Sequence, residues 1–387
     1  MSRNTENLVV PFFKPCLGRR EIAAVKRVMR SGWLTTGPES LTFEEEFAAF
    51  LNSRGRGGQW AAAVNSATAG LHLALEALGV GAGDRVAVPS LTFTATAAAV
   101  RYLGAQPVFI DSLPGSGNMD PEQLYRVRGS LKALIPVHLA GHPCDIRAIR
   151  EAAGPAVPII EDAAHAFPSY TEEGMAGTLG DVGVYSFYAT KTITTGEGGM
   201  ITGRDPDILK RIHRMRLHGI DRTVWNRYTD RAAPRSWEYD IADLGFKYNM
   251  TDVAAAIGRV QLSRADSLYA MRREQAAAYT SAWNGVEGLE LPEDVCGHAW
   301  HLYIVKTSSR EQRDGLADWL HHEGICCSVH FIPLHRMSYW RKNYNLLPEN
   351  FPVADSLADR ILSIPLWPGM KKQQQQRVIA ALKEYFQ

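Results

Sequence analysis

The sequence predicts an α/β protein with a large domain on a mostly parallel sheet at residues 1–262 and a smaller C-terminal α+β domain at residues 263–387. From about residue 60 to 201, short apolar runs alternate with helical patterns. Strands that are apolar along their whole length are typical of parallel sheets with helices on both faces. A chain of 387 residues with 45% hydrophobic content is also long enough for a second core.

The first predicted helix of this alternation begins near Thr68, because Leu71, Leu75 and Leu78 recur at helical spacing. Either Asn65 or Ser66 lies in its cap region. The expected strands then follow at 85–90, 106–111, 133–141, 157–166 and 182–189, with helical segments at 94–104 and 144–153 between them. Ligands of such sheets gather at the carboxyl ends of the strands, so the residues just after each strand are the first candidates for a site.

The second half of the chain has a different pattern. Residues 220–245 are polar, aromatic and weakly periodic, which predicts a long loop. Residues 250–283 predict a long helix with a break near 263–266, and strands are expected at 300–307 and 326–333 in the smaller domain. The glutamine run at 373–376 predicts an exposed helical turn.

Composition excludes several function classes. The net charge is +1 and the pI about 7.7, so no overall field selects nucleic acid or an anionic membrane surface. There is no apolar stretch long enough to cross a bilayer, and the first residues lack the pattern of a signal peptide. The five cysteines are odd in number and form no C-x-x-C pair, so neither disulfides nor a metal site are expected. We therefore expect a cytoplasmic protein.

Three segments at predicted strand ends carry reactive or anion-binding groups. Asp162 follows the apolar run of one strand, and His165 comes three residues later. Lys191 comes just after the strand that contains Ser186, and the glycine-rich "GEGG" follows it. The helix start near Thr68 carries small residues, whose backbone N–H groups suit a phosphate. Taken singly, each has an ordinary interpretation: a helix cap, or a surface lysine beside a turn.

Together these groups match the needs of pyridoxal phosphate. A lysine amine in a desolvated site forms a Schiff base with a carbonyl. A carboxylate beside the pyridine nitrogen keeps it protonated, so that the ring accepts electrons. The helix start and a serine hydroxyl hold the phosphate. The hypothesis assigns these roles to Lys191, Asp162, Thr68 and Ser186.

Eleven ordered segments between residues 31 and 370 then carry a resemblance: "SGWLTTGPES", "NSATAGLHLAL", "VPSLTFTAT", "PVHLAGHPCDI", "IEDAAHAFPS", "SFYATKTITTGEGGM", "LHGI", "GFKYNMTDVAAAIG", "HAWHLYIV", "VHFIPLH" and "ILSIPLWPGM". In these the chain resembles the nucleotide-sugar aminotransferases of the DegT/DnrJ/StrS type, which have the fold-type I, aspartate aminotransferase-like architecture. The wording of "SGWLTTGP", "SATAG", "EDAAHA" and "KYN" is most similar to enzymes that form UDP-4-amino-4-deoxy-L-arabinose.

The resemblance implies a role for each matching residue. Lys191 would form the Schiff base and move the proton, Asp162 would pair with the pyridine nitrogen, and His165 would lie near the phenolic oxygen. The remaining cofactor-binding positions are Phe93, which matches the aromatic residue stacked on the ring, and Ala67, Thr68 and Ser186, which match the phosphate site.

A second group of positions is less specific. "GFKYNM" departs from the commoner family wording "GYNYRM", so either Asn249 or Lys247 would reach the phosphate of the neighbouring subunit, with Asn249 favoured. Thr35, Thr36, His298 and His330 match positions near the substrate, but the threonines could form a turn and the histidines could belong to the core.

The resemblance implies a homodimeric enzyme with an active site shared between subunits. It would transfer an amino group from L-glutamate to a UDP- or dTDP-linked 4-keto-sugar, giving a 4-amino-sugar nucleotide and 2-oxoglutarate. Two alternatives remain open. One is a keto-sugar dehydratase with the same cofactor, against which Lys191 argues, because those relatives have histidine at its position. The other is a non-catalytic regulatory relative, for which neither a basic stripe nor a helix-turn-helix pattern is found.

Overall fold

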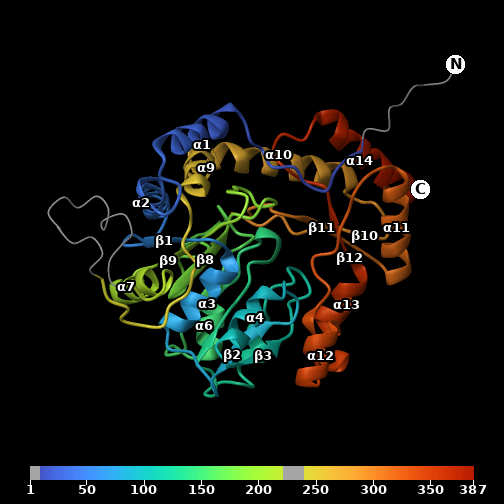
Figure 1. Cartoon of the computed structure of the whole chain (residues 1–387). Coiled ribbons are helices and arrows are strands. Elements are labelled where there is room, and N and C mark those ends of the chain that lie inside the picture. The colour runs from blue at the N-terminus through green and yellow to red at the C-terminus, as the bar shows by residue number, and fades with distance from the viewer. Residues whose placement is uncertain (1–8, 221–238) are drawn as a thin grey trace.

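The computed structural model describes residues 9–220 and 239–387 (Figure 1). Its large sheet has the strand order β3-β2-β4-β5-β8-β9-β1, in which parallel bridges at Leu134–Ile159 and Val137–Asp162 join the β3-β2-β4 part to the rest. Neighbouring strands are parallel from β3 to β8, whereas β9 is antiparallel to both of its neighbours, so the predicted mostly parallel sheet is confirmed. The strands are β1 (Trp60–Val64), β2 (Arg85–Pro89), β3 (Gln106–Ile110), β4 (Ala133–Leu134), β5 (Ile160–Asp162), β8 (Val182–Ser186) and β9 (Gly199–Gly203).

Three of the predicted strands are clearly shorter than expected, and one of them is the strand at 182–189, which ends with β8 at Ser186. The segment 133–141 contains only β4 and then turns into a 3₁₀ turn, η1 (Leu139–Gly141), and the segment 157–166 contains only β5. Pro136 and Pro158 lie in these segments, and proline has no N–H to donate to a strand ladder. Pro136 follows β4, so this segment leaves the sheet early, whereas Pro158 precedes β5 and delays the start of that strand.

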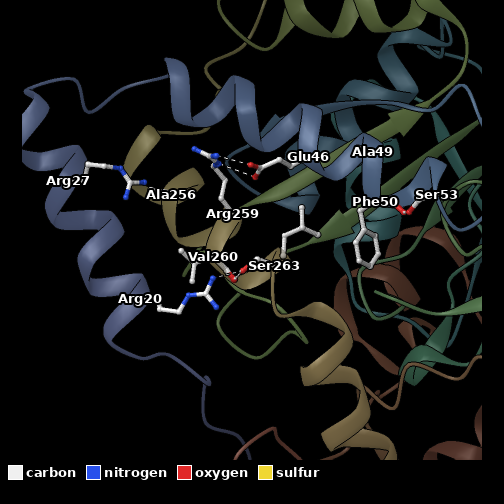
Figure 2. A pocket seen from close by; sticks show the side chains of 11 residues that line it. Arg20, Arg27, Glu46, Ala49, Phe50, Ser53, Ala256, Arg259, Val260 and Ser263 are labelled. Carbon is white, nitrogen blue, oxygen red and sulfur yellow. Dashed lines mark hydrogen bonds and ion pairs between the residues drawn. The ribbon is translucent and has the colours of Figure 1, made fainter.

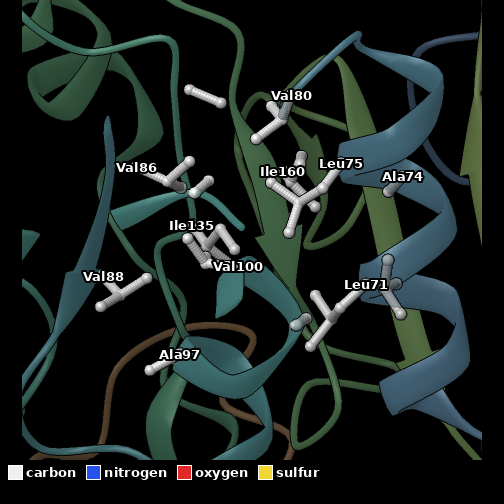
Figure 3. Close-up of a cluster of buried hydrophobic side chains, with 14 of the residues drawn as sticks. Leu71, Ala74, Leu75, Val80, Val86, Val88, Ala97, Val100, Ile135 and Ile160 are labelled. Carbon is white, nitrogen blue, oxygen red and sulfur yellow. The ribbon is translucent and has the colours of Figure 1, made fainter. Parts of the chain in front are cut away.

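Helix α3 (Ala67–Ala77) begins at the residue next to the predicted one, and Ser66 caps it by accepting a hydrogen bond from the Ala69 N–H at 3.1 Å. Leu71 and Leu75 point from α3 toward Ile160 in the core that joins helix and sheet (Figure 3). The other helices of the large sheet are α4 (Ala95–Tyr102), α5 (Pro121–Leu124), α6 (Ile146–Ala153) and α7 (Pro206–Met215), and a small hairpin is formed by β6 (Tyr170–Thr171) and β7 (Gly174–Met175).

Four helices cover the β1 side of the sheet and connect it to the C-terminal part: α1 (Arg19–Ser31), α2 (Pro38–Asn52), α9 (Asp252–Leu262) and α10 (Ala265–Trp283) (Figure 1). The predicted helix at 250–283 is thus broken between α9 and α10, as expected, and Ser263 caps the end of α9. The domain boundary at this break stays a prediction. Most of the predicted loop at 220–245 lies outside the described residues.

The C-terminal part contains an antiparallel sheet of β10 (Leu289–Glu290), β11 (Tyr303–Thr307) and β12 (Ile361–Ile364). Its helices are α11 (Arg310–His322), α12 (Ser338–Tyr344), α13 (Pro352–Arg360) and α14 (Lys372–Tyr385), with 3₁₀ turns η2 (Leu334–Arg336) and η3 (Pro348–Asn350). The glutamine run lies in the first turns of α14. Among the helices of the described ranges, none is long and apolar enough to cross a membrane.

The predicted strand at 326–333 is wrong. Its backbone pairs with Val10 through Cys326 and with Ser363 through Ser328, but it makes no continuous ladder with either segment. Residues 330 and 331 instead bend over the carboxyl edge of the large sheet and line a cavity there. The strand at 300–307 begins only at Tyr303, because Trp300 has a φ of 50°, which is left-handed and interrupts an extended chain.

Candidate active site

A cavity of about 540 Å³ lies at the carboxyl edge of the large sheet, between the sheet and the C-terminal part. Strand ends supply its floor: Thr92 follows β2, Asp162 ends β5 and Ser186 ends β8. Eight residues predicted from the sequence line this one cavity: Ala67, Thr68, Phe93, Asp162, His165, Ser186, Lys191 and His330. The structure therefore brings together groups that are far apart in the sequence.

Lys191 lies on the turn that connects β8 to β9. The backbone N–H of Lys191 donates to the Tyr188 carbonyl at 2.9 Å, and the Thr194 hydroxyl donates to the Phe187 carbonyl at 2.9 Å. The turn is therefore held by hydrogen bonds among its own residues. Gly196 has a φ of 85°, which lets the chain return to β9. The local sequence thus presents the lysine amine at the end of a buried strand.

Burial lowers the pKa of Lys191 to about 8, because the charged ammonium loses its hydration, and the nearby Asp162 carboxylate only partly opposes this change. Burial raises the pKa of Asp162, whereas hydrogen bonds to the carboxylate lower it. These bonds come from the Thr96 hydroxyl at 2.9 Å and from the Ala164 N–H at 3.2 Å. The cavity therefore holds a lysine that is partly neutral near neutral pH and a buried carboxyl group.

The start of α3 forms an anion site next to these groups. The first amides of a helix have no carbonyl partner within it, which applies here to Ala67 and Thr68. A Cβ added at Gly199 on β9 would lie 2.8 Å from the Ala67 nitrogen, so only glycine allows the helix start to approach the strand this closely. The Ser186 hydroxyl lies at the end of the adjacent strand. These groups fit the phosphate of pyridoxal phosphate.

Three histidines line another part of the cavity: His165 and His301, which are buried, and His330, which is half-buried. The ring of His165 lies 4.4 Å from that of His301, and its Nδ1 accepts from the Ala140 N–H at 3.3 Å. His330 is 2.9 Å from the Ser363 hydroxyl through its Nδ1. Burial lowers the pKa of all three, to about 4 for His330, so all three are neutral at neutral pH.

His298 is not part of this wall. It stacks on Trp300 at 4.1 Å and accepts the Trp300 N–H at 2.9 Å, and it lines a separate hollow of about 40 Å³. The histidine of "HAWH" that reaches the cavity is His301, which sequence reasoning missed. Trp300 has a left-handed backbone conformation, which directs His298 and His301 to different sides. The second histidine of "HAWH" is the one feature of the motif that could have indicated His301.

Four further predicted residues lie together outside the cavity of this chain. Lys247 donates to the Asn249 side-chain oxygen at 2.6 Å, and the Asn249 amide donates to the Thr36 hydroxyl at 2.7 Å. The Thr36 hydroxyl donates to the Met250 carbonyl at 2.6 Å, and the Thr35 carbonyl accepts from the Asp252 N–H at 3.2 Å. We call Thr35, Thr36, Lys247 and Asn249 the outer polar cluster.

The N-terminal segment contributes two aromatic side chains that no sequence pattern indicated. Phe12 and Phe13 line the cavity, and Phe12 stacks on His330 with 5.3 Å between ring centroids. Backbone bonds of Val10 with Gly324 and Cys326, each 2.9 Å, hold this segment in place. These contacts join segments that are far apart in the sequence, so no local sequence pattern could have indicated them.

A second hollow, of about 550 Å³, lies between α1, α2 and α9 (Figure 2). Its charged groups are engaged with one another: Arg259 donates to both oxygens of Glu46 at 3.0 and 2.7 Å, and Arg20 donates to the Ser263 hydroxyl at 3.1 Å. It contains none of the predicted site residues. The cavity around Lys191 is therefore the candidate active site.

The comparisons with known proteins agree with this geometry. The sequence model of the DegT/DnrJ/EryC1/StrS aminotransferase family matches residues 15–383. The spore coat polysaccharide biosynthesis protein SpsC of Bacillus subtilis is 40% identical over 98% of this chain and 97% of its own length.

Solved structures are similar over the same extent. The aminotransferase TlmJ of Streptoalloteichus hindustanus is 34% identical, with a TM-score of 0.87 over 97% of this chain and 98% of its own. Spr1654 of Streptococcus pneumoniae, described as a putative sugar aminotransferase and solved in its pyridoxamine phosphate form, is 30% identical, with a TM-score of 0.89 over 97% of this chain and 99% of its own. The predicted resemblance, fold class and cofactor are confirmed: the chain belongs to the DegT/DnrJ/EryC1/StrS family of pyridoxal-phosphate-dependent aminotransferases.

Proposed function

We propose that this enzyme transfers an amino group from L-glutamate to a UDP- or dTDP-linked 4-keto-sugar. The observation that carries the proposal is the presence of Lys191 and Asp162 in one cavity beside the anion site at the start of α3. The sugar aminotransferases among the similar structures support a sugar as the acceptor. The nucleotide and the glutamate donor follow from the family resemblance of the sequence.

Each residue then has a role in the transfer. When bound, pyridoxal phosphate supplies an electron sink and a carrier for the amino group. Lys191, neutral in part because its pKa is about 8, would take a proton from the donor's α-carbon and give it to the cofactor's C4′ carbon in the first half of the reaction. In the second half it would take a proton from that carbon and give it to the sugar carbon that receives the amino group. Asp162 would hold a proton on the ring nitrogen. His165 would donate to the phenolic oxygen from Nε2, because its Nδ1 accepts the Ala140 N–H and its neutral ring carries a single proton. Ser186 and the amides of Ala67 and Thr68 hold the phosphate.

The aromatic and histidine side chains shape the rest of the cavity. Phe12, Phe13 and Phe93 line the cavity. Phe93 would cover one face of the cofactor ring, while Phe12 and Phe13 would exclude water from the side of the N-terminal segment. Neutral His330 offers a hydrogen bond to the sugar without adding a charge. A wall of uncharged side chains suits a keto-sugar, because the carbonyl carbon that reacts carries no net charge.

A homodimer with shared active sites completes the proposal. Phe93 is 58% exposed and Tyr188 46% exposed at the mouth of the cavity, so one chain leaves the cofactor site open. A second copy that covers this mouth would bring its own polar groups to the phosphate. Within the outer polar cluster, we assign the phosphate contact to Asn249 rather than to Lys247, and contact with the substrate to Thr35 and Thr36.

The test is a substrate panel. Purified enzyme with pyridoxal phosphate and L-glutamate is incubated with UDP- and dTDP-linked 4-keto-pentoses and 4-keto-6-deoxyhexoses, and the products are identified by mass. We expect one amino-sugar per 2-oxoglutarate formed, and none from Lys191→Ala in spite of an unchanged fold. Loss of water from the sugar without consumption of glutamate would favour the dehydratase, and no reaction with any sugar would favour a regulatory relative.

A further inference from the structure

Two threonines next to Asp162 have no role in the reaction proposed above. Thr96 lies in the first turn of α4 and Thr92 lies in the connection from β2 to α4, and both line the cavity. They are 1% and 2% exposed, respectively. The Thr96 hydroxyl is 2.9 Å from Asp162 Oδ2, and the Thr92 hydroxyl is 3.0 Å from that of Thr96.

Chemistry fixes the direction of these two hydrogen bonds. An ionised carboxylate only accepts hydrogen bonds, so the Thr96 hydroxyl must give its single proton to Asp162. The Thr96 oxygen can then meet Thr92 only as an acceptor, which makes Thr92 the donor. The hydroxyls therefore form a chain from Thr92 through Thr96 to Asp162, in which each bond polarises and strengthens the next.

The chain opposes the effect of burial on Asp162. Asp162 is 5% exposed, and within the described part of the chain its other carboxylate oxygen accepts only from the Ala164 N–H, at the longer distance of 3.2 Å. Burial alone raises the pKa of Asp162, and the Thr96 hydrogen bond is the largest of the influences that lower it. Without this bond the group would hold its proton more firmly and would be a weaker partner for a protonated ring.

We propose that Thr92 and Thr96 are positioning residues that keep Asp162 oriented and ionised, so that the cofactor's ring nitrogen carries the proton. This inference rests on the role given to Asp162 in the proposed function. Thr96 acts directly on the carboxylate and Thr92 acts through Thr96, so their removal should have graded effects. In this role both threonines act through Asp162 and not on the reacting atoms.

The test compares variants that remove a hydroxyl and keep the volume. Thr96→Val should raise the dissociation constant for pyridoxal phosphate about tenfold, the loss expected for a hydrogen bond to a charged group. With ¹⁵N-labelled cofactor, the ring-nitrogen resonance should move toward that of the unprotonated ring, because the proton shifts to a more basic Asp162. Thr92→Val should give a smaller change in the same direction, and Thr96→Ser should restore both values.

A matched control separates this role from general packing. Thr178 is buried too, and its hydroxyl donates to the Met175 carbonyl at 2.7 Å away from Asp162. Thr178→Val should lower thermal stability without moving the ring-nitrogen resonance. If Thr96→Val fails to fold, Thr92→Val carries the same test, because it leaves the direct bond in place.

Asp162→Asn distinguishes the possible failures. If it moves the resonance and Thr96→Val and Thr92→Val do not, the chain of hydroxyls is unimportant and this inference is wrong. If Asp162→Asn itself leaves the ring nitrogen protonated, the role of Asp162 is wrong, and the inference fails together with it.

Discussion

The pH dependence of cofactor capture gives a sharp test of the Lys191 environment. Capture requires the neutral amine, since only that form attacks the cofactor's carbonyl carbon. The ordinary pKa of 10.5 is lowered to about 8 in this cavity. At pH 7 about one tenth of the Lys191 amines are then neutral, compared with about 0.03% of ordinary lysines, a difference of roughly 300-fold in reactive amine.

The assay mixes apo-protein with pyridoxal phosphate in a stopped-flow instrument from about pH 6 to about pH 10, which brackets the lowered value. The rate constant for the appearance of the lysine-bound absorbance should rise about tenfold per pH unit and level off above about pH 8. Asp162→Asn should move this midpoint to lower pH, because the Asp162 carboxylate raises the pKa of Lys191. Replacing the exposed Lys26 by alanine is the matched control and should change nothing.

A rate that still climbs about tenfold per pH unit above about pH 9 would refute the reasoning, since it would show an amine that keeps its full hydration. A midpoint near 8 that Asp162→Asn does not shift would show that burial lowers the pKa but that the carboxylate does not act on the amine.

Three further predictions concern other parts of the molecule. Phe93→Ala should raise the dissociation constant for pyridoxal phosphate roughly three- to tenfold, the range expected from the loss of one stacking contact, and Phe93→Trp should not; equilibrium titration of the apo-protein decides. Glu44→Gln should lower the free energy of unfolding by about 3 kcal/mol, because the buried Arg216 guanidinium keeps its hydrogen bond to the Ala63 carbonyl but loses its counter-charge. Both side chains are 7% exposed, and a loss below about 1 kcal/mol in chemical denaturation would contradict this. The pKa of His330 is about 4 instead of 6.5, so the unfolded chain binds more protons between these values and stability should fall as the pH drops through this window. Melting temperatures should show a shallower fall for His330→Gln, and equal slopes would exclude His330 as the cause.

Much of the large sheet could be predicted because its strands are buried on both faces, which leaves continuous apolar runs in the sequence. The start of α3 was within one residue of the prediction, since Ser66 is a good cap and the leucines behind it repeat at helical spacing. The prediction of a strand at 326–333 is wrong because its local sequence favours a strand but its surroundings do not. Its β-branched and aromatic residues favour extended structure, but no other segment of the described residues pairs with it in a continuous ladder. Strand formation depends on such tertiary contacts.

The candidate site also contains residues that could be predicted from the sequence and residues that could not. Asp162 and Lys191 could be predicted because they follow strand ends, where a parallel sheet places its ligands. Phe12 and His301 could not, because the N-terminal segment and the C-terminal part reach the cavity only through packing across the whole molecule. Thr92 and Thr96 also look like ordinary helix-start residues until their contact with Asp162 is seen.

The central claim is that Lys191 is the amine on which the reaction depends. Its most direct test is to reduce the enzyme–cofactor complex with borohydride, digest it and locate the added mass by mass spectrometry. The account predicts a single modified peptide that contains Lys191 and no modified lysine in Lys191→Ala. A cofactor attached to any other lysine, or a Lys191→Ala enzyme that still converts glutamate at the wild-type rate, would contradict it.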